Sequence, residues 1–342
     1  MCPEDNQLIS IALSRFGISY DSALDHSISL STFGIHGDKH YRIICNSNAY
    51  SLRLLADDRY SSETELASAS DLNQQLYATD RIRAHGLPFM KRVQPTTDSN
   101  NTFSMIRDDA GRAWRCVLFD WIDGTHITAQ TKSSVSKMGA LLRQLHEIPV
   151  DSQFSFPVVD HTVAYQKWHH DLSKVDTVIT TIDQQRLGNY LDLVQFHIYQ
   201  AQRRLKNDVL PVLSTDLNAL NILWKNDHIV GIVDHEHIGY SDRIQDLAWI
   251  LKWYARNEGI HSFSVSPVLA QTILGNYDMN IFDHDDFVRL KSLLWLSGCF
   301  NFHFVRQTFH LLSDSIVSNE ELSNHLERYR QRGKALLSLL AK

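Results

Sequence analysis

Apolar and polar residues alternate in short runs over the first 120 residues, which is the pattern of half-buried strands. Two such runs, residues 41–44 and 50–55, flank the turn-forming sequence Asn46-Ser47-Asn48. Helical spacing occurs at residues 7–16 and again from about Ser62 to His85, where Gly86 ends the pattern. The first 120 residues therefore predict a small antiparallel sheet with helices, its other strands lying near residues 28–30, 102–107 and 114–119.

The pattern becomes helical after residue 124. Apolar residues recur at spacings of three and four and form one helical stripe, Val135, Met138, Leu141, Leu142 and Leu145. Most of the remaining chain has helical spacing, apart from a strand-turn-strand near residues 221–234. An α+β half is thus followed by a mostly helical half.

Composition excludes several classes of protein. With 43% apolar and 21% charged residues, the 342-residue chain is globular and long enough for two domains. The formal net charge of −6 and the lack of a basic block argue against a nucleic-acid partner. No apolar run is long enough for a membrane span, and the first residues do not resemble a secretory signal. Four widely spaced cysteines suit reduced thiols, so we expect a cytoplasmic location. We also expect a monomer or homodimer.

The strongest chemical signal lies at residues 216–234. Apolar runs on both sides of residues 225–228 predict a hairpin, which would place Asn221 near Asp234. Asp216 precedes Asn221 by five residues, the spacing of the base and a metal-binding Asn in kinases. Mg²⁺ takes few protein oxygens and leaves its other positions to water and phosphate. These three side chains therefore predict a site for phosphoryl transfer.

The whole segment resembles the HGDxxxxN…IDFE…DxxxDLA signature of the aminoglycoside phosphotransferase and choline kinase superfamily. This resemblance implies a two-lobed, protein-kinase-like α+β fold that uses ATP and Mg²⁺ to phosphorylate a hydroxyl of a small molecule. It also implies that Asp216 is the catalytic base and that Asn221 and Asp234 bind the metal. Asp246 would be a structural acid that braces the catalytic loop.

Further resemblances extend over most of the chain. Residues 117–124, including Phe119 and Trp121, look like the hinge whose backbone holds adenine, and residues 138–146 look like the LGxxLxxLH helix. In that helix Gly139 is expected to allow close packing and His146 to be structural. The implied lobes are residues 1–119 and 124–342, joined by residues 120–123, with ATP between them.

Two resemblances concern the nucleotide phosphates. Arg53 matches the strand cation that holds the α- and β-phosphates, while the loop around Gly34 and Gly37 would cover them. That loop has no sharp glycine pattern.

The chain also departs from the family pattern. Ser214 stands where the signature has His, and the helix acid that pairs the strand cation has no clear equivalent. The candidate positions for that acid are Gln74 or Gln75, with Glu63 and Glu65 earlier in the chain.

Several alternatives stay open at this point. His235 and His237 would share one face of a strand and could bind zinc. A pseudokinase that only binds nucleotide, or a kinase-fold enzyme that transfers AMP, would retain much of the same signature. The acceptor is open among alcohols, amino alcohols, sugars and aminoglycosides. A cationic acceptor would suit three acidic residues, Glu236, Asp242 and Glu258.

Overall fold

The computed structural model describes most of the chain: residues 3–21, 25–30, 38–56, 72–96, 101–149, 156, 160–175, 181–202, 211–260, 262–278, 282–313 and 319–340. The chain forms two compact units. Unit 1 comprises Met1–Thr125, Asp151–Pro157 and Asn221–Gly239, and unit 2 comprises His126–Val150, Val158–Leu220 and Tyr240–Lys342. None of the described helices is both long enough and apolar enough to cross a bilayer.

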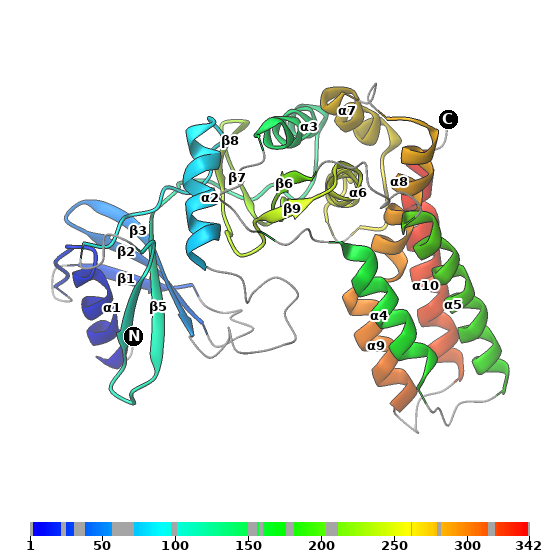
Figure 1. Cartoon of the computed structure of the whole chain (residues 1–342), viewed down its shortest axis with the longest axis horizontal. Coiled ribbons are helices and arrows are strands. Elements are labelled where there is room, and N and C mark those ends of the chain that lie inside the picture. The colour runs from blue at the N-terminus through cyan, green and yellow to red at the C-terminus, as the bar shows by residue number, and fades with distance from the viewer. Residues whose placement is uncertain are drawn as a thin grey trace. The chain divides into compact units, whose positions relative to one another are not determined.

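Unit 1 is built on an antiparallel sheet of five strands (Figure 1). The strands lie in the order β1-β2-β3-β5-β4. They are β1 (His26–Ser29), β2 (Lys39–Cys45), β3 (Asn48–Ala56), β4 (Ser104–Arg107) and β5 (Ala113–Asp120). The five strands match the runs that predicted them. Burial alternates along β2, whereas consecutive residues are buried in the second half of β5.

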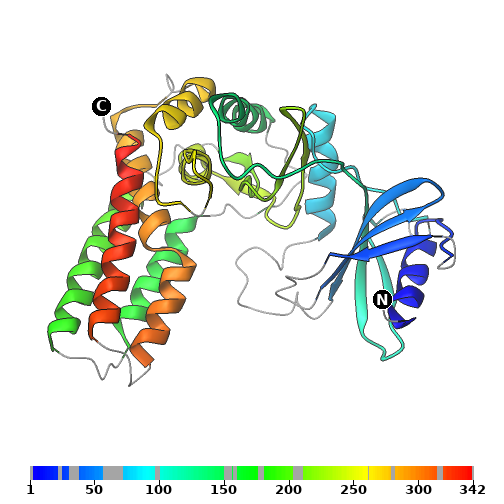
Figure 2. The same ribbon diagram turned by 180° about the vertical axis from the view of Figure 1, so that it is seen from behind.

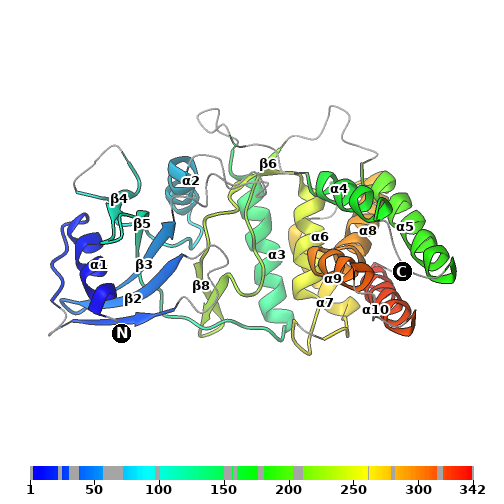
Figure 3. The ribbon, with the colours of Figure 1, turned by 90° about the horizontal axis from the view of Figure 1, so that it is seen from below.

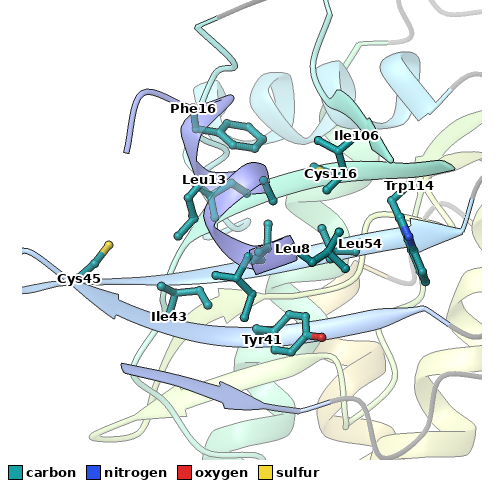
Figure 4. Close-up of a cluster of buried hydrophobic side chains, with 14 of the residues drawn as sticks. Leu8, Leu13, Phe16, Tyr41, Ile43, Cys45, Leu54, Ile106, Trp114 and Cys116 are labelled. Carbon is teal, nitrogen blue, oxygen red and sulfur yellow. The ribbon is translucent and has the colours of Figure 1, made fainter. Parts of the chain in front are cut away.

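Each face of this sheet is covered by a helix. Helix α1 (Pro3–Ser14) packs on one face through Leu8, Leu13 and neighbouring residues (Figure 4). The side chains that β5 sends to this face include Trp114 and Cys116. On the other face, Val117 packs with helix α2 (Leu72–Ala84). The alternation in β5 therefore supplies two separate hydrophobic clusters, one for each helix.

Two tight turns have the backbone that short hairpins favour. Asn46 and Ser47 have φ values of 49° and 63° between β2 and β3. Asn226 and Asp227 have φ values of 51° and 61° between β7 (Ile222–Lys225) and β8 (His228–Ile232). Positive φ at both central residues matches the right-handed twist of the flanking strands, and Asn and Asp tolerate it well. The predicted turn positions are thus confirmed in both hairpins.

The β7–β8 hairpin belongs to unit 1 because its backbone is bonded there. The N–H of Ile232 donates to Pro88 O at 2.8 Å, and the N–H of Met90 donates to Ile232 O at 3.2 Å. On the other strand, Thr125 and Trp224 exchange two backbone hydrogen bonds of 2.8 and 2.9 Å. The hairpin is therefore fixed from both sides. The lobe boundaries expected from the sequence therefore remain a prediction.

Unit 2 is mostly helical. Helices α4, α5, α9 and α10 contact one another in a bundle, and α8 packs against α5, α6 and α10 (Figure 2). The helices are α3 (Lys132–Glu147), α4 (His161–Ser173), α5 (Thr181–Gln202), α6 (Arg243–Tyr254), α7 (Pro267–Tyr277), α8 (His284–Cys299), α9 (Phe302–Ser313) and α10 (Asn319–Ser338). All five residues of the predicted stripe in α3 are buried, which confirms that helix.

One element of the described chain was missed by pattern analysis. Strands β6 (Val212–Ser214) and β9 (Gly239–Ser241) form a two-stranded sheet. In the sequence, β6 precedes the β7–β8 hairpin and β9 follows it. Each has three residues, which is too short for an alternating pattern to be recognised. The sequence predicted a single strand-turn-strand in this half, so that expectation was incomplete.

Glycine in α3 allows a close helix crossing. A Cβ added at Gly139 would lie 2.5 Å from the carbonyl oxygen of Ile273 on α7. Helices α3 and α7 run close together in Figure 3. A carbonyl oxygen of a packed helix cannot move aside as a flexible side chain can, so the packing role expected for Gly139 is confirmed.

A buried ion pair joins three helices of unit 2. Arg289 on α8 donates to the two carboxylate oxygens of Asp242 at 2.8 and 2.6 Å, and its Nε donates to Ala201 O on α5 at 2.6 Å. Asp242 Oδ1 also accepts the backbone N–H groups of Ile244 and Gln245 and so caps the N-terminus of α6. The side chains are only 2% and 8% exposed, so the two charges depend on each other.

Replacement of Gly139 by Ala should lower the free energy of unfolding by about 1–3 kcal/mol, because the new methyl group must displace the α7 backbone. The measurement is urea unfolding followed by circular dichroism. Gly188→Ala on α5 is the matched control, since nothing lies within 4 Å of the added Cβ. That control should gain about 0.5–1 kcal/mol from the better helix former. Equal gains in both variants would contradict the close crossing.

Replacement of Arg289 by Met should lower the free energy of unfolding by about 3–5 kcal/mol, because Asp242 is left buried and charged. The double variant Asp242→Asn/Arg289→Met should regain part of this loss, since the amide still caps α6 without a charge. Urea denaturation of the two variants measures both effects. A loss below about 1 kcal/mol in the single variant would show that the pair does not hold the three helices.

Candidate functional site

The β7–β8 hairpin brings two of the predicted metal ligands to one end. Ile222 pairs with Ile232, and the N–H of Val233 donates to Asn221 O at 2.8 Å. Asn221 therefore precedes β7 at the same end of the hairpin where Asp234 follows β8. Asp234 has a left-handed backbone with φ of 76°, and its Oδ1 accepts the N–H of Glu236 at 3.2 Å. A non-glycine residue in this conformation is uncommon and is often found at functional sites.

Arg53 on β3 faces the same segment. Its guanidinium lies 3.6 Å from Asp234 Oδ1 and 3.3 Å from Glu236 Oε1. The arginine side chain is 24% exposed, and the two carboxylates are 26% and 20% exposed. The predicted phosphate-binding cation is therefore half-buried beside a predicted metal ligand. Glu236 was not predicted as its partner, because the two residues lie far apart in the sequence.

The helix position expected to hold an acid holds Gln75 instead. Its side-chain amide donates to the backbone oxygen of Glu236 at 2.8 Å, and the residue is only 3% exposed. In the described part of α2 the acidic residue is Asp80, which pairs with Arg92 at 2.7 Å. Gln75 thus fixes the segment that carries Asp234 and Glu236 without supplying a charge. Glu63 and Glu65, the other candidates, lie outside the described residues.

The hinge residues have clear structural partners. Phe119 is 1% exposed in the cluster under α2, and its ring lies 5.6 Å from that of His235. The indole N–H of Trp121 donates to Asp123 Oδ1 at 3.1 Å, while Arg42 lies over its ring at 4.7 Å. Because these side chains are engaged, an adenine base at this segment would contact its backbone, as expected from the sequence. Gly34 and Gly37, expected to cover the phosphates, lie outside the described residues.

The arrangement does not support a zinc site. His235 is fully buried against Phe119, whereas His237 is exposed in a turn, so the two rings do not share a face as expected for a strand. Across the described residues, no group of three or more His, Cys, Asp or Glu side chains could hold a metal ion. Asn221 and Asp234 offer hard oxygen donors and a partly exposed carboxylate. These features fit Mg²⁺, which keeps positions for water and phosphate.

Asp216, the predicted base, belongs to unit 2. Its Oδ2 accepts the side-chain amide of Asn218 at 2.7 Å, and its Oδ1 accepts the indole N–H of Trp249 on α6 at 2.8 Å. These bonds fix the orientation of the carboxylate from both sides. The sequence did not reveal this polar role of Trp249, because Asp216 is 33 residues away.

A second group of unit 2 braces α6. His146 on α3 contacts the hydroxyl of Tyr277 on α7 through Nδ1 at 2.6 Å and Asp246 on α6 through Nε2 at 3.0 Å. His146 is buried, so the structural role expected for it is confirmed. Asp246 has His146 as its described partner, and its bracing of the catalytic loop stays a prediction.

The three acidic residues that suggested a cationic acceptor are all engaged within the chain. Glu236 pairs with Arg53, Asp242 pairs with Arg289, and Glu258 accepts a hydrogen bond from Ser262 at 3.0 Å. Glu236 and Asp242 therefore have their charges paired with arginines, whereas Glu258 has only a neutral donor. A cationic acceptor stays a prediction from the sequence.

Comparisons with known proteins assign the chain to a family. Residues 39–263, more than half of the chain, match the Phosphotransferase enzyme family. A search of curated protein sequences finds no significant match. The fold resembles solved structures at low sequence identity, which supports the fold alone.

Three of these structures illustrate the likeness. A spectinomycin phosphotransferase in complex with ADP and spectinomycin is 14% identical, with 98% of each chain covered and a TM-score of 0.65. An amicoumacin kinase in complex with AMP-PNP and Ca²⁺ is 14% identical, with 96% of this chain and 93% of that chain covered and a TM-score of 0.62. A microcompartment-associated aminopropanol kinase is 13% identical, with coverage of 96% and 95% and a TM-score of 0.61.

The family match and these likenesses confirm two predictions, the α+β kinase-like fold and the phosphotransferase class. The chain belongs to the phosphotransferase enzyme family.

Proposed function

We propose that this protein transfers the γ-phosphoryl group of ATP, with Mg²⁺, to a hydroxyl group of a small molecule. Family membership supports the reaction class. The observation that carries the proposal is the placement of Asn221 and Asp234 at one end of the β7–β8 hairpin, with Arg53 3.6 Å from Asp234. Of the related structures, one contains ADP with spectinomycin and another AMP-PNP with Ca²⁺, which is consistent with a nucleotide, a divalent cation and a small acceptor.

The residues of unit 1 would bind the nucleotide phosphates. Arg53 would exchange its contacts with Asp234 and Glu236 for phosphate oxygens, which its planar guanidinium can grip in pairs. Asn221 and Asp234 would hold Mg²⁺. When bound, this ion neutralises charge on the phosphates. Gln75 would keep Glu236 and Asp234 in place through the Glu236 carbonyl.

Asp216 of unit 2 would act on the acceptor. Its carboxylate would accept or orient the proton of the attacking hydroxyl, while Trp249 and Asn218 hold it in one orientation. The backbone around Phe119 and Trp121 would contact adenine, and the loop of Gly34 and Gly37 would cover the phosphates. A cytoplasmic location and a monomeric or dimeric state remain predictions from the sequence.

Asp216→Asn should lower turnover roughly 10²–10⁴-fold, because a positioned base is lost. It should leave the stabilisation by MgATP nearly unchanged, since Asp216 is assigned to the acceptor. Asp234→Asn should instead remove most of that stabilisation, because an amide is a poorer ligand for a hard cation. Thermal unfolding with and without MgATP measures binding, and ADP release with a panel of hydroxyl compounds measures turnover.

The outcomes separate the alternatives. If Asp216→Asn abolished MgATP stabilisation while Asp234→Asn retained it, the two roles would be reversed. Stabilisation of the wild-type protein without any loss of the γ-phosphate would favour a pseudokinase. Mass spectrometry of the product would reveal AMP transfer. If millimolar MgATP had no effect on the wild-type protein, the proposed function would be wrong.

Arg53→Ala should lower kcat/KM for ATP about 10–100-fold, because a hydrogen-bonded charge contact with phosphate is lost. Arg53→Lys should recover part of this loss through charge alone. Arg107→Ala is the control, since Arg107 is an exposed arginine of the same sheet that donates to Gly111 O. Steady-state kinetics at varied ATP concentration measure all three variants. Equal values for Arg53→Ala and the wild-type protein would exclude Arg53 from the nucleotide site.

A further inference from the structure

A group of aromatic and cationic side chains surrounds Asp216 in unit 2. Trp249, Lys252 and Trp253 lie on one side of α6, at spacings of three and four residues. The Lys252 ammonium lies 4.1 Å from the centre of the Trp249 ring and 5.5 Å from that of Trp253. Because Trp249 donates its indole N–H to Asp216, Lys252 lies directly behind the partner of the predicted base.

Lys252 is unusual because it is a buried cation. The residue is 8% exposed, and within the described residues its ammonium lies against indole faces rather than in an ion pair with a carboxylate. A buried charge is costly unless an opposite charge compensates it, and indole faces offset only part of that cost. Within the described residues, the positive charge of Lys252 is therefore only partly compensated.

The charges around Lys252 add to this imbalance. The pKa of Lys252 is lowered to about 7, mainly by burial and also by Arg332 of α10 and Arg256, while Asp216 opposes this shift. Arg256 is 2% exposed and donates to the carbonyl oxygens of Lys252 and Ser262. Lys252 thus lies within electrostatic reach of two arginines and of the carboxylate of Asp216. An incoming anion would stabilise the protonated lysine, whereas a cation would be repelled.

Unsatisfied polar atoms in the same place also point to a ligand. Tyr254 is fully buried, and its hydroxyl, which Asp216 influences electrostatically, has no hydrogen-bond partner in the described part of the chain. The indole N–H of Trp253 and Nη2 of Arg256 likewise have no described partner. Buried donors without partners are rare in folded proteins and often mark positions where a ligand or water binds.

We propose that the acceptor carries an anionic group, a carboxylate or a phosphate, in addition to its reactive hydroxyl, and that Lys252 binds this anion. The inference rests on the proposed function, because it concerns the acceptor side of Asp216. Aromatic rings beside the cation would contact the carbon skeleton of the acceptor. A polycationic acceptor such as an aminoglycoside would be disfavoured, because the cations of this group would repel it.

The test uses acceptors that share a hydroxyl framework and differ in charge. One set is glycerol, glycerate, glycerol phosphate and 3-amino-1,2-propanediol; the other is glucose, glucuronate, glucose phosphate and glucosamine. ADP release is measured for the wild-type protein, Lys252→Met, Lys252→Arg and the control Lys334→Met, which removes an exposed charge of α10. Binding of the same compounds is measured in parallel by thermal unfolding in the presence of MgADP.

The anionic members should be the better acceptors of the wild-type protein. Lys252→Met should raise their KM about 10–100-fold, the usual effect of losing a hydrogen bond to a charged group. It should leave the KM of neutral members within about threefold, and Lys252→Arg should retain part of the anion preference. Lys334→Met should behave as the wild-type protein. Comparing the carboxylate and phosphate members identifies which anion is preferred.

Two results would overturn the inference. One is a preference for the cationic members in the wild-type protein. The other is that Lys252→Met changes neither the turnover of any anionic compound nor its thermal protection. The inference is equally overturned if no anionic compound is turned over or protects the protein. If Lys252→Met fails to fold, the wild-type preference and Lys252→Arg still decide the matter. Stabilisation by MgATP is measured separately, so failure of the acceptor inference is distinguishable from failure of the proposed phosphotransfer.

Discussion

The buried pair of Asp242 and Arg289 is the constraint on which the catalytic side of unit 2 depends. The carboxylate caps α6 while the guanidinium binds it from α8 and also binds the end of α5. Helix α6 in turn carries Trp249, which orients Asp216, and Lys252 one turn later. Because both charges are buried, the first turn of α6 cannot shift without leaving one of them unpaired. The position of the predicted base is therefore set by an ion pair that does not touch it.

Unit 1 achieves comparable precision with backbone bonds instead of a buried ion pair. Both strands of the β7–β8 hairpin are bonded to flanking segments, through Pro88 and Met90 on one side and Thr125 on the other. Gln75 then holds the carbonyl of Glu236 beyond the hairpin. A neutral amide suffices for this purpose, because the charge that balances Arg53 comes from the hairpin segment itself. Within the described residues, the carboxylates beside Arg53 are thus those of Asp234 and Glu236, and none comes from α2.

Local features were predictable from the sequence, and long-range pairings were not. The turns at Asn46 and Asn226 depend on two residues each, so their residue types were sufficient to predict them. Strands β6 and β9 were missed because pairing, not pattern, creates them. The bonds of Asp216 to Trp249 and of Arg53 to Glu236 join residues far apart in the sequence, which no spacing rule can relate. The pairing of Asp242 with Arg289 was not predicted for the same reason, since its partner lies on another helix.

The contacts of Arg53 also bear on how a nucleotide could enter. Its distances of 3.6 and 3.3 Å to Asp234 and Glu236 are longer than those of a tight charged hydrogen bond, and all three side chains are partly exposed. Such a pair is weak in water, so phosphate oxygens can replace it at little cost. Before a nucleotide binds, the carboxylates keep the guanidinium in place. Under the proposed function, nucleotide binding would release Asp234 to bind Mg²⁺. The same residue can therefore hold the arginine ready in one state and bind a metal ion in the other.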